Sequence, residues 1–280
     1  MGRPRPNGRN KTISVRTTQK DAPLTKIVMT EEESAHDREI SLKLDVMRAE
    51  LKNHPADGER WVAYGDFIVK HFCDVREAIR AFERAAELLP RWDNRVRLGE
   101  ALVLSGKTEE GLATMRASIA EKPRSSAYCI LASVYANLDM LEKARTACEE
   151  AIELDENCEE AYYLLAEYSR KQSREEAIGL YRKAIEIDPD YELAWQGLGS
   201  LLTGTDNTLR EGIDALKKAV ELNSGDGWAW VFLANAYWKA DELDDAEDCY
   251  QRAIAAYPDY EDIRRWHDQF LAAREQERDE

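Results

Sequence analysis

The sequence lacks the segments that would take a chain into or across a membrane. No apolar run approaches the roughly 18 residues that a membrane-spanning helix requires. The N-terminal residues include basic side chains, but the apolar stretch of a secretory signal is missing. We therefore predict no membrane insertion and no secretory signal.

The chain is also poor in the groups that hold metals or carry out catalysis. None of its four histidines pairs with another histidine or with a cysteine at a spacing typical of metal ligands. His71 and Cys73 flank Phe72, but no further ligands accompany them. A glycine-rich phosphate loop and a nucleophile elbow are both missing. The sequence therefore predicts no cofactor, no metal site and no catalytic residue, and it favours a protein that is not an enzyme.

Cysteines are few and unpaired in pattern. The five of them are odd in number and form no C-x-x-C pair. Most lie beside apolar residues at helical positions, where a cysteine behaves as a small hydrophobic residue. A reducing compartment is the simplest interpretation, so we predict a cytoplasmic protein.

Charge is unevenly distributed along the 280 residues. Residues 1–29 contain seven basic residues and one acidic residue, whereas the whole chain has a net charge of −16, so the remainder carries −22. Such a surface repels a phosphate backbone, which argues against nucleic acid as the main ligand. The acidic body instead favours basic or neutral partners.

Residues 1–29 are rich in Arg, Pro, Gly, Asn and Thr and have little to bury, so we predict a disordered basic tail. Residues 2–6 faintly resemble the core of an AT-hook, without the flanking order of that motif. The tail is also poor in acidic residues, as organelle transit peptides are. A plain solvated tail is the favoured interpretation, while a targeting role or weak contact with nucleic acid stays open.

A capping helix is predicted within residues 30–57. Thr30 and Glu33 have the spacing of a capping box, which marks a helix start. The apolar stripe of the helix consists of Ile40, Leu44, Met47 and Leu51. His54-Pro55 ends it, because the residue before a proline is pushed out of the helical region.

Residues 58–259 repeat one pattern six times at a spacing near 34 residues. The repeats are 58–91, 92–124, 125–158, 159–191, 192–226 and 227–259. A small residue recurs in the first half of each, at Gly65, Gly99, Ala132, Ala166, Gly199 and Ala234. Two more small columns run through the second half, starting at Ala78 and Ala85. Small residues allow two antiparallel helices to approach closely, and large side chains between them fill the remaining space, so each repeat is predicted to be a helix pair.

The pattern resembles the tetratricopeptide repeat (TPR) family, whose period is 34 residues. The aromatic residue that begins the family motif is present as Trp61, Tyr128, Tyr162, Trp195 and Trp230. The terminating proline is present as Pro90, Pro123, Pro189 and Pro258. Departures from the motif are Arg95 for the aromatic, Cys148 for a bulky residue, and Glu156 and Ser224 for the proline.

This resemblance implies an all-α protein, a right-handed α-solenoid of about six TPR helix pairs. Residues 260–280 are expected to form a C-terminal capping helix and a charged tail, because a repeat array otherwise exposes its core at the end. The capping stripe is Ile263, Trp266, Phe270 and Leu271.

The resemblance also implies that ligands lie along the concave face, which the first helix of each repeat lines. The positions predicted to contact a partner are Glu59, Val62, Asp66, Asp93, Val96, Glu100, Tyr163, Glu167, Gln196, Trp228, Val231, Asn235 and Trp238. Their acidic and apolar character favours a peptide with basic and apolar residues. The Lys/Asn clamp that some family members use for a chaperone's acidic C-terminus has no counterpart here. In an alternative arrangement, Trp228 and Trp238 pack against the last helix around Trp266 and Phe270.

Two classes of function follow from the sequence. The first is a non-catalytic scaffold or adaptor that binds a protein or peptide in the concave groove. The second is a regulatory or assembly subunit of an enzyme complex, or an adaptor tethered to nucleic acid through the basic tail. The pattern makes no prediction about the oligomeric state.

Overall fold

The computed structural model describes residues 35–71 and 74–279. The predicted basic tail, the capping box at residues 30–33 and Cys73 lie outside the described residues. The chain divides into two compact units, Met1–Val46 and Met47–Glu280. Helix α1 (Ala35–Asn53) runs through the boundary between them. In the second unit, Leu51 of α1 is buried, and Arg48 Nε donates a hydrogen bond to the Tyr64 hydroxyl at 2.9 Å.

The second unit is an array of helix pairs, and the described residues contain no strand. The first helices are α2 (Gly58–His71), α4 (Trp92–Leu104), α6 (Ser125–Asn137), α8 (Glu159–Ser169), α10 (Glu192–Leu202) and α12 (Gly227–Lys239). The second helices are α3 (Val75–Leu88), α5 (Thr108–Glu121), α7 (Leu141–Leu154), α9 (Arg174–Ile187), α11 (Leu209–Leu222) and α13 (Leu243–Ala256). A short 3₁₀ turn, η1 (Asp206–Thr208), precedes α11, and α14 (Glu261–Asp279) follows the last pair. The predicted all-α solenoid is therefore confirmed.

Small residues bring the two helices of a pair together. A Cβ atom built on Gly99 of α4 would lie 2.9 Å from the Gly111 carbonyl oxygen of α5. One built on Gly111 would lie 2.5 Å from the Gly99 carbonyl oxygen. Both distances are shorter than real Cβ contacts, so only glycine at these two positions permits this approach of the backbones.

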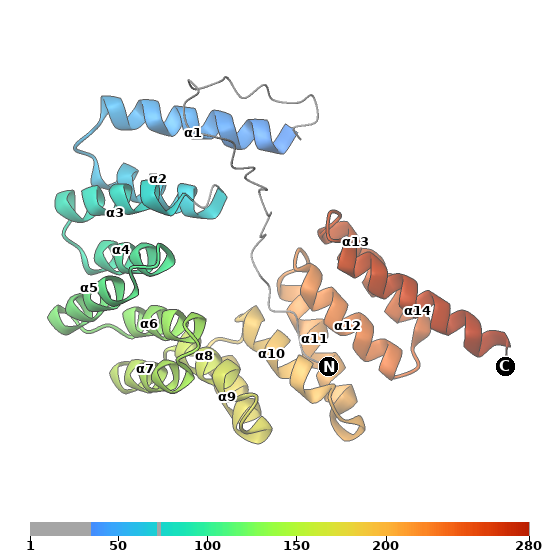
Figure 1. Ribbon diagram of the computed structural model, residues 1–280. Helices are drawn as coiled ribbons and strands as arrows, with labels where there is room; N and C mark the ends of the chain where they lie inside the picture. The colour runs from blue at the N-terminus through green and yellow to red at the C-terminus, as the bar shows by residue number, and fades with distance from the viewer. Residues whose placement is uncertain (1–34, 72–73, 280) are drawn as a thin grey trace. The chain divides into compact units, whose positions relative to one another are not determined.

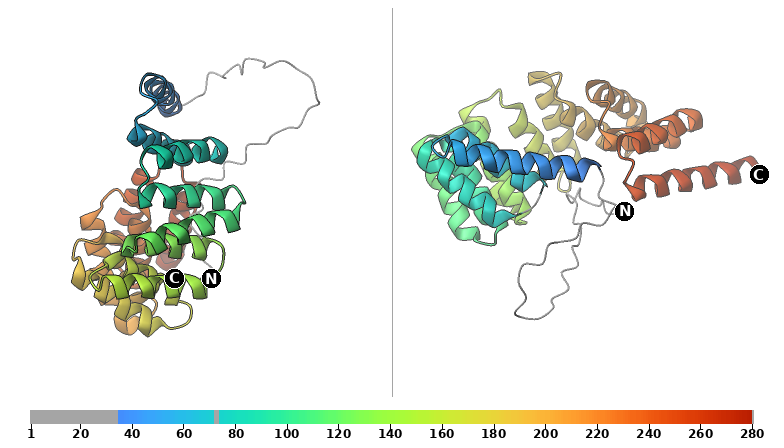
Figure 2. Two further views of the ribbon diagram at one scale, coloured as in Figure 1. Left: turned by 90° about the vertical axis from the view of Figure 1, so that its left-hand side faces the viewer. Right: turned by 90° about the horizontal axis from the view of Figure 1, so that it is seen from above.

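Large side chains fill the space beside the small columns. Tyr181, Tyr250 and Met115 are completely buried, and each lies in a second helix. Figures 1 and 2 show the helix pairs from α2 to α13 following one another in chain order. Each second helix also packs against the first helix of the following pair, as α3 does against α4 and α11 against α12. The core is therefore continuous along the array, as in other repeat proteins.

The last helix packs against the end of the array. Ile263 and Phe270 of α14 are fully buried, and Trp266 and Leu271 are partly buried against the same apolar clusters. These four residues are the stripe predicted from the sequence. They lie at positions i, i+3, i+7 and i+8, which places them on one face of a helix.

Candidate partner-binding surface

The first helices of the array line one side of the second unit. Successive first helices contact one another, from α4 to α6, α8, α10 and α12. Among the described residues, no two successive second helices pack against each other as extensively. The array therefore curves locally with its first helices on the inner side. This is the side on which the sequence predicted the partner to lie.

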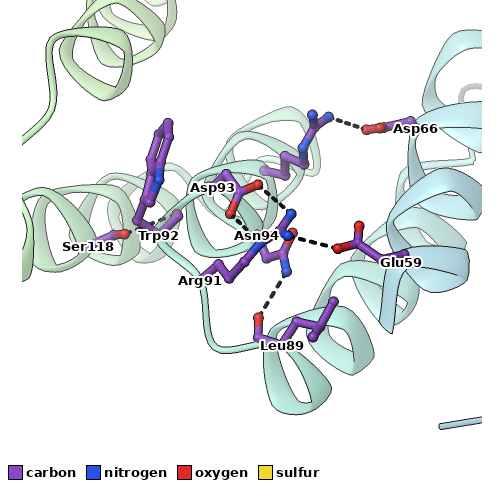
Figure 3. A network of polar contacts seen from close by, with 9 residues as sticks. Glu59, Asp66, Leu89, Arg91, Trp92, Asp93, Asn94 and Ser118 are labelled. Atoms are coloured by element: carbon purple, nitrogen blue, oxygen red, sulfur yellow. Dashed lines mark hydrogen bonds and ion pairs between the residues drawn. The ribbon is translucent and has the colours of Figure 1, made fainter. Parts of the chain in front are cut away.

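Three of the four predicted carboxylates at the N-terminal end have an arginine partner. Arg91 Nη1 lies 2.8 Å from Glu59 Oε1, and Arg91 Nη2 lies 2.9 Å from Asp93 Oδ2 (Figure 3). Arg97 Nη1 lies 2.5 Å from Asp66 Oδ1. Sequence reasoning missed both arginines. The signal was available, because Arg91 follows Glu59 by 32 residues and Arg97 follows Asp66 by 31, close to one repeat.

Glu100 is the exception among these acids. It has no ion-pair partner within 4 Å among the described residues. Burial raises the pKa of Glu100, the nearby charge of Asp66 raises it further, and Arg97 only partly opposes them. Burial likewise raises the pKa of Asp66, despite its ion pair with Arg97. The inner side of α2 and α4 thus holds two carboxylates that are poorly hydrated for charged groups.

The three predicted valines are buried in the core, which corrects the predicted surface. Val62 is 8% exposed, Val231 is 3% exposed and Val96 is fully buried. Val96 belongs to the cluster that contains Met115 and Leu131. A first helix is covered by its own second helix and by neighbouring repeats, so it has fewer outward positions than the sequence analysis assigned. These valines are therefore not available to a partner.

In the middle of the array, Tyr163 lies among other aromatic rings. Its ring centroid is 5.5 Å from that of Tyr191 and 6.1 Å from that of Tyr181. Burial raises the pKa of Tyr163, so this hydroxyl stays protonated. The Tyr181 hydroxyl donates a hydrogen bond to Glu167, whose carboxylate also lies 2.8 Å from Arg170 Nη1. Glu167 is thus held by the protein itself.

Glu160, at the start of the same helix, is different. Loss of hydration raises its pKa, and the neighbouring charge of Glu159 adds to the effect. Although its side chain reaches solvent, it has no ion-pair partner within 4 Å among the described residues. Glu160 resembles Glu100 in these respects and was not among the residues predicted to bind a partner.

The predicted polar residues at the C-terminal end are hydrogen-bonded. Gln196 Nε2 donates to Asp226 Oδ2 at 2.5 Å. The Tyr250 hydroxyl donates to Asn235 Oδ1 at 2.8 Å. The carbonyl oxygen of the Asn235 side chain is therefore already bonded within the repeat.

The two predicted tryptophans pack against the last helix. The Trp228 ring lies 5.8 Å from that of Trp266 and 5.2 Å from that of Tyr260, measured between centroids. The Trp238 ring lies 5.5 Å from that of Phe270. Of the two arrangements left open by the sequence, the structure has the one in which these rings belong to the terminal packing.

In the part of the chain that the structure describes, no three side chains among His, Cys, Asp and Glu are grouped as metal ligands. The helices described there are too short or too polar to span a bilayer.

Comparison with known proteins agrees with this architecture. Tetratricopeptide repeat family models match residues 74–126, 125–158, 159–191 and 205–268. The Caenorhabditis elegans tetratricopeptide repeat-containing protein trd-1 is 25% identical over 177 residues, which are 63% of this chain and 21% of trd-1. The rat mitochondrial import receptor subunit TOM70 is 24% identical over 183 residues, 62% of this chain and 30% of TOM70.

Among solved structures, the Cut9–Hcn1 hetero-tetramer of the APC/C has the same fold. It matches with a TM-score of 0.63 at 16% identity, covering 84% of this chain and 47% of that one. This chain spans less than a third of the length of trd-1 and of TOM70. The matched repeats cover more than half of the sequence, so the chain belongs to the tetratricopeptide repeat family.

Proposed function

We propose that this chain is a non-catalytic scaffold or adaptor that binds a protein partner along the inner surface of its first helices. The ligand is a peptide segment with basic and apolar residues. The pattern of the cysteines supports a reducing, cytoplasmic location. The family supports the general role, because tetratricopeptide repeats commonly bind other proteins.

The observation that carries this proposal is that Glu100 and Glu160 have raised pKa values and lack an ion-pair partner among the described residues. Both carboxylates have a raised pKa through loss of hydration, and neither has an ion-pair partner within 4 Å among the described residues. Glu100 is half-buried, so its charge without a partner is unfavourable in the free protein, whereas Glu160 is exposed and offers a second carboxylate without a partner. A Lys or Arg side chain from a ligand would supply the missing cation. Such a ligand would also hold both glutamates ionised, so its binding should weaken as the pH falls toward their pKa values.

The experiment begins with affinity capture, cross-linking and mass spectrometry to identify the partner. The affinity of the purified partner is then measured for Glu100→Lys and Glu160→Lys. We expect each variant to bind about tenfold more weakly, as expected when like charge replaces a paired carboxylate. The control is Glu149→Lys, an exposed position on second helix α7, which should bind as the unchanged chain does.

The proposed surface would be contradicted if Glu100→Lys and Glu160→Lys bound the partner as tightly as Glu149→Lys does and if the affinity did not respond to salt. A different result is expected if the partner is an enzyme and the chain is its regulatory subunit. The rate of that enzyme would then change when the purified chain is added. This outcome would replace the scaffold interpretation.

A further inference from the structure

The second repeat departs from the others at the aromatic position, and the structure shows what this position does elsewhere. Trp61 Nε1 donates to the Pro55 carbonyl oxygen at 3.0 Å. Trp195 donates in the same way to Pro189 at 2.8 Å, and Trp230 donates to Ser224 at 2.9 Å. In each case the acceptor lies six residues before the tryptophan. The aromatic thus ties the first helix to the turn that precedes it.

In the second repeat, this hydrogen bond is made by another residue. Arg95 stands at the aromatic position, and the carbonyl six residues earlier belongs to Leu89. That oxygen accepts a hydrogen bond from Asn94 Nδ2 at 2.9 Å (Figure 3). Because Asn94 ties down the turn, Arg95 is released from that role. The loss of the aromatic is compensated within the same helix turn.

Arg95 instead borders a cavity of about 420 Å³ at the start of α4 and the end of α5. Its Nη1 atom lies 2.5 Å from Glu121 Oε2, while its Nε atom is buried and has no hydrogen-bond partner. The charged residues lining the cavity are Arg91, Arg95, Lys122 and Arg124 with Asp93 and Glu121. The cavity therefore has two more positive than negative side chains, in a chain whose net charge is −16.

Two of these cations lack a carboxylate. Arg91 pairs with Asp93 and also with Glu59, which does not line the cavity, and Arg95 pairs with Glu121. Lys122 and Arg124 have no ion pair within 4 Å among the described residues, and the Arg124 guanidinium lies 5.5 Å from the centroid of the Trp92 ring. Helix α4 also begins here, and its N-cap residue, Arg91, makes no side-chain capping bond. The first N–H groups of the helix add to the positive potential.

We propose that this cavity binds a phosphate group carried on a phosphorylated Ser or Thr side chain of a partner protein. A phosphate monoester carries close to two negative charges at neutral pH, which matches the excess of two cations. Guanidinium groups such as those of Arg95 and Arg124, which line the cavity, bind phosphate oxygens through charge-assisted hydrogen bonds. The phosphorylated partner rests on the proposed function, whereas the affinity of the cavity for phosphate does not.

The test uses the full chain with two probes, inorganic phosphate and a short glycine-flanked phosphoserine peptide. Titrations are followed through the backbone amide NMR signals of residues 91–95, 118–122 and 124. We expect both probes to shift these signals and to compete with each other, with the peptide binding more tightly. The unphosphorylated peptide should shift none of them. Affinity should rise between about pH 5 and pH 7, as the phosphate loses its second proton.

Two variants identify the site. Lys122→Gln removes an exposed cation, and Arg95→Trp restores the aromatic that three other repeats carry, so both should remain folded. We expect each to bind phosphoserine peptide about tenfold more weakly. Lys107→Gln removes an exposed cation at the opposite end of α5 and should have no effect.

Each failure is informative. No response to either probe, or equal losses in Lys122→Gln and Lys107→Gln, would overturn the site. Binding of inorganic phosphate without binding of the phosphoserine peptide would overturn the partner side chain as its source. If Glu100→Lys lost partner binding while its phosphate titration stayed unchanged, the result would support the inner surface as the partner site and the cavity as a separate phosphate site.

Discussion

Arg91 and Arg97 pair with most of the acidic residues that the sequence predicted to bind a partner at the N-terminal end of the array. By pairing with Glu59, Asp93 and Asp66 they remove most of the negative charge that the sequence offered to a ligand. The two pairs of Arg91 are largely solvated, and such pairs stabilise a fold by only about 0–1 kcal/mol. A basic ligand would therefore displace Arg91 at little cost, whereas Glu100 needs no displacement.

Two glycines, Gly106 and Gly179, allow the effect of backbone conformation on stability to be measured without a change in side-chain packing. Gly106 has φ of 88°, and a Cβ atom there would meet no atom within 4 Å. Gly106→Ala should lower the free energy of unfolding by about 1 kcal/mol, because only the left-handed backbone is penalised. Chemical denaturation monitored by circular dichroism would measure the difference.

Gly179 is the matched control. It is exposed in the middle of helix α9, and a Cβ atom there also meets nothing within 4 Å. Gly179→Ala should raise the free energy of unfolding by roughly 0.5–1 kcal/mol, because alanine is the better helix former. A change of the same sign in both variants would contradict the assignment of the turn at Gly106.

Cys158 should be the most reactive of the four cysteines that the structure describes. Its Sγ atom lies 3.8 Å from that of Cys129, and the hydrogen bond between the two thiols lowers the pKa of Cys158 to about 7. Burial instead raises the pKa of Cys148 and of Cys249 to about 12. We expect iodoacetamide to modify Cys158 first, with a rate that rises between about pH 6 and pH 8 as the thiolate forms.

Mass spectrometry of the modified peptides would follow this reaction at several pH values. Because the pKa of Cys158 is lowered in the folded state, its thiolate stabilises the fold above the ordinary pKa near 9. That contribution is lost as the pH falls through about 7. Cys129→Ala tests the cause, since removing the hydrogen-bonding thiol should raise the pH at which Cys158 reacts. Faster labelling of Cys148 than of Cys158 would contradict the lowered pKa of Cys158 as the cause of its reactivity.

At the scale of helices, the sequence predicted the pairs well because their contacts are local and periodic. The small columns at Gly99 and Ala78 lie where helices touch, and they recur at one period. The sequence predicted less well which residues of each first helix face the surface. Val96 was placed on the surface by its position in the family motif, but each first helix is also covered by the neighbouring repeats. Cover by a neighbour depends on how repeats are stacked, which a single repeat does not encode.

The closeness of the helices within a pair can be tested at Ala184, which is fully buried in α9. Ala184→Leu should destabilise the protein by about 1–3 kcal/mol, because the added methyl groups have no space. The neighbouring Lys183→Leu is the control, since the Lys183 side chain lies at the surface and pairs with Glu186. It should change stability by no more than about 0.5 kcal/mol. Similar thermal unfolding of both variants would contradict the helix register.

At the scale of the second unit, the C-terminal end of the array differs from its middle. The sequence predicted a terminal helix with the stripe that is buried in α14, but it did not decide what Trp228 and Trp238 contact. Both rings pack against α14, so they stabilise the end of the array. Whether these rings face a partner or the last helix could be decided only from the position of α14, which depends on long-range packing. The candidate surface accordingly lies on the helices before α12.

The packing of α14 makes a prediction about how far a defect spreads. Phe270 is fully buried against Tyr250 and Trp238, so Phe270→Ala should cost about 3–5 kcal/mol of local stability. Because each repeat contacts only its neighbours, the loss should remain near the end of the array. Hydrogen exchange read by mass spectrometry should become faster in α12 and α13 and stay unchanged in α4 and α5. Arg265→Ala, at an exposed position of the same helix, should change neither region. Faster exchange along the whole array in Phe270→Ala would instead show that it unfolds as one cooperative unit.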